Sequence, residues 1–181
     1  DDPLFFELFR SAMQSVGVSL CRMLMFPLDD ESKSFLLDAD IILLSGGDTG
    51  SGWSIFKENN LQPIIESCYQ NVAVITGISA GAIQLGPLGW REEKKDGIST
   101  YSTFQLHDYI VSPHDEENGW QTLKKLVMQT GKSGLAIPFG GGVRLAPNSP
   151  PCSIKGPAYV FTPGESEPSK KCLPMCFEYC L

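Results

Sequence analysis

Two uninterrupted apolar runs, each followed at once by a glycine-containing turn, constrain the fold of this chain more than any other feature. Asp40-Ile41-Ile42-Leu43-Leu44 leads into Gly46-Gly47, and Val72-Ala73-Val74-Ile75-Thr76 leads into Gly77. Apolar runs without alternation are typical of strands that are covered on both faces, as in parallel sheets. Segments with helical spacing stand between the runs. We therefore expect an α/β fold, a three-layer sandwich with a mostly parallel central sheet and helices on both faces.

The rest of the chain fits this alternation. Asp2-Pro3 has the form of a helix start, and apolar residues then recur at helical spacing until Gly17. Further helices are expected over 29–37, 53–69 with a break near Asn60, 80–85 and 119–129. Strands are expected over 19–26, 109–111, 134–138, 143–145 and 159–161, the last two antiparallel. Residues 90–102 indicate a loop or hairpin, and the polar stretch beyond Pro163 indicates a tail.

Length, charge and hydropathy narrow the function classes. A chain of 181 residues fits one domain, which we place at 1–165, with a cysteine-containing tail at 166–181. The net charge of −7 argues against nucleic-acid binding, which needs basic patches. No apolar run approaches the roughly 18 residues of a membrane span. We expect a cytoplasmic protein that binds neither nucleic acid nor membrane.

Six cysteines are present, and none predicts a metal site strongly. Cys21 and Cys68 lie in apolar periodic segments and are expected to be buried thiols. Cys172, Cys176 and Cys180 have helical spacing, but no histidine follows to complete a zinc site. We expect a reduced tail without metal or disulfide.

The turn Gly77-Ile78-Ser79-Ala80-Gly81 predicts a serine nucleophile. Flanking glycines allow a sharp strand-to-helix turn, a nucleophile elbow, that exposes the serine hydroxyl. The required context is present, since a predicted strand precedes the turn and a predicted helix follows it. The competing interpretation is a serine that merely caps an ordinary crossover helix.

Only two histidines could serve as the base. His114 lies just past the predicted strand that includes Tyr109, at its carboxyl end, where active residues of open α/β sheets lie. His107 lies before that strand. His114 is therefore the better candidate.

A carboxylate that orients the imidazole should come from the loop between the serine and the histidine. Asp96 is our first candidate, with Glu92 and Glu93 as alternatives. Asp115 is adjacent to the histidine, and neighbouring side chains rarely point at one another.

A second glycine turn could supply oxyanion donors. Gly46-Gly47-Asp48-Thr49-Gly50 follows a strand and opens a helix, so it exposes backbone N–H groups. The same turn could cradle a phosphate, although it lacks the Gly-Lys-Ser/Thr of a P-loop.

Three passages together resemble the dipeptidase E and cyanophycinase family of serine peptidases. They are the strand with Gly46-Gly47-Asp48-Thr49, the Gly77-Ile78-Ser79-Ala80-Gly81-Ala82 motif, and Val111-Ser112-Pro113-His114. The resemblance covers roughly residues 1–165 and implies a fold akin to class I glutamine amidotransferases. It implies Ser79 as nucleophile, His114 as base, an acid near Asp96, and oxyanion donors from Gly47 and Ala80. Members are typically intracellular and cleave small aspartyl or isoaspartyl peptides without a metal or organic cofactor.

Three departures from the family pattern modify these expectations. The family begins with a strand before the first helix, whereas this sequence opens in the helix, so a central strand is expected to be missing. Residues Asp115-Glu116-Glu117 follow the histidine where dipeptidases carry arginines, so the recognised substrate residue is expected to be neutral or basic. Phe139-Gly140-Gly141-Gly142 lacks the family's acidic residue at a strand end.

We therefore expect a serine-type peptidase that cleaves a small peptide through an acyl-enzyme at Ser79. The alternative is a non-catalytic relative that binds a ligand or a protein, and the sequence leaves the oligomeric state open.

Overall fold

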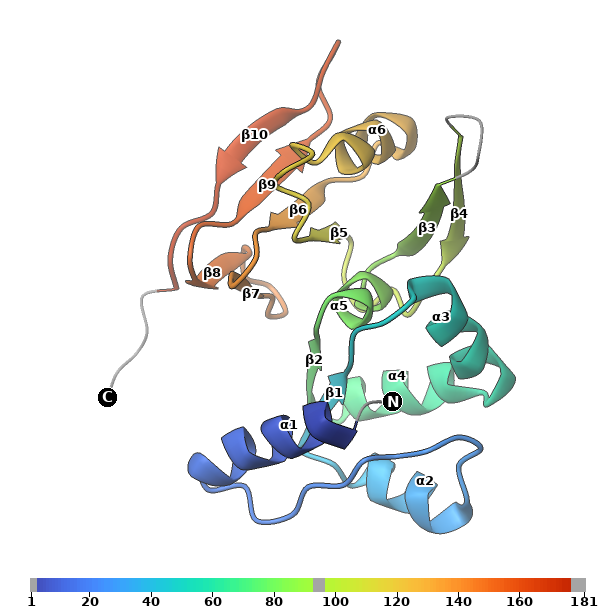
Figure 1. Cartoon of the computed structure of the whole chain (residues 1–181). Helices are drawn as coiled ribbons and strands as arrows, with labels where there is room; N and C mark the ends of the chain where they lie inside the picture. The colour runs from blue at the N-terminus through green and yellow to red at the C-terminus, as the bar shows by residue number, and fades with distance from the viewer. Residues whose placement is uncertain (1–2, 93–96, 177–181) are drawn as a thin grey trace.

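The computed structural model describes residues 3–92 and 97–176, which form an α/β chain of six helices and ten strands (Figure 1). The helices are α1 (Pro3–Ser15), α2 (Asp30–Leu37), α3 (Thr49–Glu58), α4 (Leu61–Gln70), α5 (Ala80–Leu85) and α6 (Gln121–Thr130). The strands are β1 (Ile41–Leu44), β2 (Val74–Gly77), β3 (Leu88–Glu92), β4 (Ile98–Ser102), β5 (Ile110–Pro113), β6 (Gly134–Ile137), β7 (Gly142–Arg144), β8 (Cys152–Lys155), β9 (Tyr159–Thr162) and β10 (Ser169–Cys172).

The strands fall into four sheets. β1 and β2 pair in parallel, from Ile41 opposite Val74 to Leu44 opposite Gly77. A four-stranded sheet has the order β10-β9-β6-β5, in which β5 and β6 are parallel and the other pairs antiparallel. β3–β4 and β7–β8 are two-stranded antiparallel sheets. The α/β class is confirmed, but the two parallel pairs are not hydrogen-bonded into one sheet, so the three-layer parallel sandwich stays a prediction.

Local sequence signals account for several element ends. Asp29 caps α2, because its Oδ1 accepts the Ser32 N–H at 2.8 Å. Asn60 adopts a left-handed backbone with φ 49° and separates α3 from α4, as the break expected near this residue requires. The segment 90–102, expected as a loop or hairpin, contributes to the β3–β4 hairpin.

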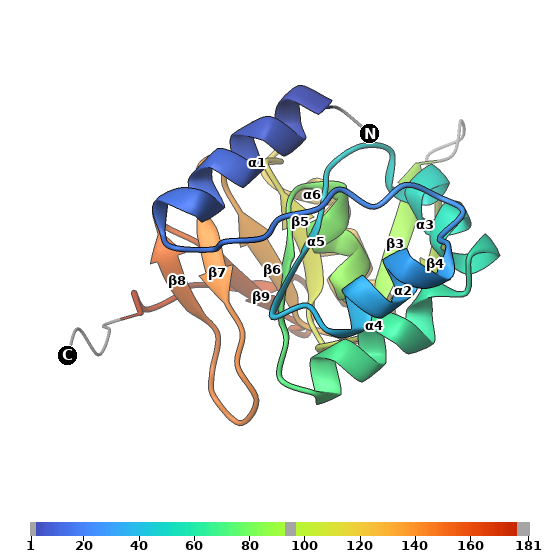
Figure 2. The ribbon, with the colours of Figure 1, turned by 90° about the horizontal axis from the view of Figure 1, so that it is seen from below.

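The strand expected over 19–26 does not form. This segment belongs to no strand and has no ladder partner among the described residues, and there β1 is paired on one edge only, by β2. An open cavity of about 990 Å³ lies between α1, this segment and β1, lined by Phe5, Phe9, Met13, Leu24, Ile42 and Leu44 among others. α1 and the segment lie below β1 and β2 in Figure 1 and in front of them in Figure 2. An apolar run without a pairing partner cannot satisfy the backbone groups of a strand, which explains the failed prediction.

The expectation of a polar, reduced tail after Pro163 is also wrong for the described residues. β10 pairs with β9 as the outer strand of the four-stranded sheet. Lys170 Nζ lies 3.8 Å from the Tyr159 ring centroid, and Cys152 is bonded to Cys176 by a disulfide. Lysines and serines are common on edge strands, so this composition indicated a tail where an edge strand exists. A disulfide is unusual in a reducing compartment, so it does not favour the cytoplasmic location expected.

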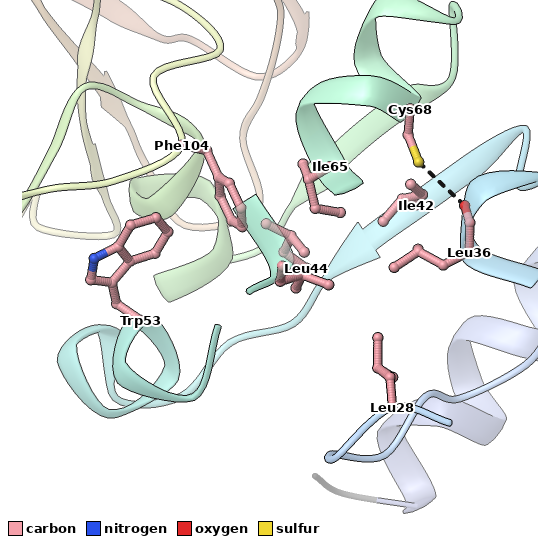
Figure 3. Close-up of a cluster of buried hydrophobic side chains, with 9 residues drawn as sticks. Leu28, Leu36, Ile42, Leu44, Trp53, Ile65, Cys68 and Phe104 are labelled. Carbon is pink, nitrogen blue, oxygen red and sulfur yellow. Dashed lines mark hydrogen bonds between the residues drawn. The ribbon is translucent and has the colours of Figure 1, made fainter. Parts of the chain in front are cut away.

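Two apolar clusters form most of the core. The first packs α2, α3 and α4 around β1 and includes Trp53, Ile65 and Phe104 (Figure 3). Buried Cys68 belongs to it, and its thiol donates to the Leu36 carbonyl at 3.3 Å. The second cluster packs α6 against β5, β6 and β9. The prediction of a buried thiol is confirmed for Cys68, whereas Cys21 is only half-buried.

None of the helices in the described ranges combines the length and apolar character that crossing a bilayer demands.

Candidate active site

Ser79 lies at the junction of β2 and α5 in a strained backbone conformation. Its φ is 52° and its ψ is −113°, outside the regions that L-residues ordinarily adopt. A Cβ added at Gly77 would lie 2.5 Å from the Ala82 nitrogen, and one at Gly81 would lie 2.2 Å from the Leu44 carbonyl oxygen. Both glycines are therefore needed for the turn to pack, as the nucleophile-elbow prediction requires.

His114 lies directly after β5, in the strand-end position that the sequence predicted. Its backbone N–H donates to the Ile137 carbonyl at 2.8 Å, and its φ of 42° also lies in the left-handed region. The Ser79 Oγ and the His114 Nε2 lie 2.7 Å apart. This distance is that of a nucleophile hydrogen-bonded to its general base. The structure thus brings together the two residues chosen from the sequence.

His107 has a different environment. It is half-buried, and this burial lowers the pKa of its imidazole to about 4. Its Nδ1 accepts the Tyr109 N–H at 3.2 Å. A neutral imidazole that accepts a backbone N–H is typical of a structural role.

The glycine turn after β1 lies beside the nucleophile turn. The Ile78 N–H donates to the Leu44 carbonyl at 3.0 Å, and a Cβ on Gly46 would lie 3.4 Å from the Ser79 Cβ. Gly47 has a φ of 138°, which favours glycine. The two turns that contain Gly47 and Ala80, the expected oxyanion donors, therefore lie next to each other.

The start of α3 is capped internally. Asp48 Oδ1 accepts the Ser51 N–H at 2.7 Å. Hydrogen bonds from the side chain and the backbone of Ser51 hold the pKa of the Asp48 carboxyl below its ordinary value. A phosphate at this helix start would meet a carboxylate instead of unpaired N–H groups. The phosphate-cradle interpretation is therefore disfavoured.

Arg91 is a cation beside this turn that sequence reasoning did not place. Its guanidinium lies over Gly50, where an added Cβ would come within 2.2 Å of Nη2. It also contributes to the lowered pKa of Asp48. The glycine at position 50 is the one sequence signal of this contact, because any side chain there would displace the guanidinium.

Two of the candidate acids, Asp96 and Glu93, lie outside the described residues. Glu92 is described and accepts a hydrogen bond from Thr122 Oγ1 at 2.8 Å, at the start of α6. Within residues 3–92 and 97–176, no carboxylate is hydrogen-bonded to the His114 ring. The identity of the orienting acid stays a prediction.

The acidic residues after His114 are mostly engaged within the protein. Asp115 Oδ1 accepts from Asn118 Nδ2 at 2.9 Å, and Glu116 Oε1 accepts the Phe139 N–H at 2.9 Å. The Phe139 N–H, and to a lesser degree the charge of His114, hold the pKa of the Glu116 carboxyl below its ordinary value. Glu116 therefore ties the His114 loop to the loop after β6, a role that sequence reasoning missed.

Comparison with known proteins identifies a family for this chain. The sequence model of peptidase family S51 matches residues 1–145. The uncharacterized peptidase YgaJ of Bacillus subtilis (strain 168) is 31% identical over 84 residues, which are 46% of this chain and 36% of that relative. The matched segment thus spans about a third of the relative's length.

Two solved structures share the fold. A peptidase from an acI-B1 Actinobacterium superposes with a TM-score of 0.70 at 16% identity, covering 97% of this chain and 77% of that one. A putative peptidase E protein from Listeria monocytogenes EGD-e superposes with a TM-score of 0.60 at 20% identity, covering 96% of this chain and 80% of that one. The resemblance to the dipeptidase E group is confirmed.

Proposed function

Because the chain belongs to peptidase family S51, we propose that it is a serine-type peptidase that cleaves a small peptide through an acyl-enzyme on Ser79. The observation that carries this proposal is the 2.7 Å separation of Ser79 Oγ and His114 Nε2 on two strained turns. A hydroxyl alone is a weak nucleophile, and a base within hydrogen-bond reach activates it.

The first half of the reaction forms the acyl-enzyme. Ser79 Oγ attacks the substrate carbonyl carbon while its proton passes to His114 Nε2. The negative charge moves to the carbonyl oxygen, where we place the N–H groups of Gly47 and Ala80. The C–N bond then breaks, and His114 returns the proton to the leaving amine.

The second half repeats these steps with water. His114 takes a proton from the water, the resulting nucleophile attacks the ester, and Ser79 Oγ leaves with the proton. In this proposal Asp96 orients the imidazole, with Glu92 or Glu93 as alternatives. No metal or organic cofactor takes part.

The substrate is expected to carry a neutral or basic recognised residue. Asp115 and Glu116 are hydrogen-bonded internally, so exposed Glu117 is the member of the acidic trio with no hydrogen-bond partner among the described residues. The acidic trio still disfavours an anionic side chain close to His114.

Labelling with a fluorophosphonate probe tests the proposal directly. The wild type should be labelled at Ser79, and Ser79→Ala should lose both labelling and peptide hydrolysis, on the order of 10⁴- to 10⁶-fold in kcat. Ser15→Ala, which alters an exposed serine at the end of α1, is the matched control and should keep both. Unlabelled wild type or undiminished turnover by Ser79→Ala would overturn the proposal.

One observation favours the alternative, a non-catalytic binding domain. β1 is paired on one edge only among the described residues, beside the cavity of about 990 Å³. A protein that folds with a well-formed Ser79–His114 pair but reacts with no probe would support it.

A further inference from the structure

Phe139 is among the most exposed apolar side chains of the described residues, with 86% of its surface accessible to solvent. It stands in the loop after β6, at the carboxyl end of the strand beside the one that leads to His114. Single exposed apolar residues are ordinary on protein surfaces, so exposure by itself carries no argument. What distinguishes Phe139 is its position and the hydrogen bonds that fix its loop.

Two hydrogen bonds hold this loop against the catalytic histidine. The His114 N–H donates to the carbonyl of Ile137, two residues before Phe139. The Phe139 N–H donates to Glu116, two residues after His114. The backbone of Phe139 is therefore fixed to the loop that carries the base, through its own N–H and through the carbonyl of Ile137.

The chemistry of the proposed reaction says what this side of the site faces. His114 must hand its proton to the leaving amine, so the leaving group lies beside the imidazole. A residue tied to the His114 loop accordingly lies toward the leaving-group part of the substrate. Ile78, next to Ser79, is also an exposed apolar residue.

The residue type adds to this argument. An exposed aromatic side chain offers apolar contact area and no charge to a neighbouring group.

We propose that Phe139 is a specificity-determining residue that contacts the leaving-group residue of the substrate, and that this residue is apolar. The inference rests on the proposed function and names the substrate class of the same site. It predicts that a dipeptide ending in leucine is preferred to one ending in glycine. A hydrophobic contact of this size is worth about tenfold in discrimination.

The test compares Ala-Leu with Ala-Gly, which differ only in the leaving residue. The wild type should hydrolyse Ala-Leu with about tenfold higher kcat/KM. Phe139→Ala should bring the ratio close to one, through a higher KM for Ala-Leu. Phe139→Leu should keep most of the preference. Val72→Ala alters an equally exposed residue in the turn before β2 and should change neither substrate.

Binding to Ser79→Ala separates this inference from the proposed function. Calorimetry with this variant should show tighter binding of Ala-Leu than of Ala-Gly, and the added change Phe139→Ala should abolish the difference. Such a result upholds the inference even if the wild type hydrolyses neither peptide, in which case the proposed function fails alone. Equal binding of the two peptides, or a preference that survives Phe139→Ala, would overturn the inference.

Discussion

The two apolar clusters differ in how completely they are closed. In the cluster around α6, the side chains of Ile110, Leu123, Leu126 and Val127 are 0% exposed, and Leu88 at its margin is 9% exposed. In the cluster around β1, Leu28 and Ile42 retain 8% and 7% exposure, and the cavity of about 990 Å³ opens beside them. Exposed Leu20 lines that cavity. Ser79 follows β2, next to the open cluster, and His114 follows β5, next to the closed one. The hydrogen-bonded pair of Ser79 and His114 therefore joins a firmly packed region to a loosely packed one.

This difference shows which packing holds each residue of the Ser79–His114 pair in place. His114 is held by a strand of the four-stranded sheet and by a hydrogen bond to its neighbour β6. Ser79 is held by close backbone packing of α5 against β1. Stability should depend mainly on the closed cluster, and reactivity on the contact between the two.

The largest expected effect concerns the carboxylate that orients His114. Asp96→Asn should lower kcat by about 10⁴-fold, because the imidazole would lose its orientation and the stabilisation of its charged form. Asp115→Asn should change kcat only a few-fold, since Asp115 is hydrogen-bonded to Asn118. Steady-state kinetics with one peptide substrate measures both.

If Asp96→Asn leaves kcat unchanged while Glu93→Gln or Glu92→Gln lowers it strongly, the orienting acid is the earlier glutamate of the loop. If all three variants keep full activity, the pair works without an orienting carboxylate.

The next effect tests the contrast in packing. Leu126→Ala in the closed cluster should lower the free energy of unfolding by about 3 kcal/mol, because it leaves a cavity in a fully buried site. Leu20→Ala beside the open cavity should cost less than about 0.5 kcal/mol, since 68% of Leu20 is already exposed. Urea unfolding followed by circular dichroism gives both values. Equal losses would show that the two regions do not differ in this way.

The smallest effect is the pH dependence from His107. Its pKa of about 4 in the folded protein lies below the ordinary value of 6.5. Between these values the unfolded chain binds more protons, so stability rises with pH. Through His107, the free energy of unfolding should be lower at pH 5 than above pH 6.5 by about 2 kcal/mol.

His107→Gln should flatten this part of the stability profile, measured by urea unfolding at several pH values. Ser79→Ala, which leaves both His107 and exposed His114 in place, is the control for the effect of a substitution as such. An unchanged slope in His107→Gln would assign the acid sensitivity to other groups.

Sequence reasoning found the parts of the site that rest on local pattern. The turn around Ser79 needs glycine at fixed positions, and His114 follows an apolar strand, so both signals lie within a few residues. The break at Asn60 and the cap at Asp29 are local in the same sense.

What the sequence did not reveal depends on partners distant along the chain. The bond from Phe139 to Glu116 joins two loops 23 residues apart, and no local pattern marks it. β10 was taken for a tail because an edge strand needs few apolar residues. The segment 19–26 has the composition of a strand, but composition alone does not supply a neighbour to pair with.

The backbone of the two proposed catalytic residues has a consequence for engineering. Ser79 and His114 both have positive φ, at 52° and 42°, although neither is glycine. The placement of the two side chains thus depends on the turns and on the strands that support them, and the five-residue motif alone does not determine it. Grafting the motif onto another scaffold would transfer the hydroxyl without its placement. In this fold, by contrast, a designer could exchange the side chain at position 79 for another short nucleophile such as cysteine, while a β-branched threonine would meet the strain that the turn already bears.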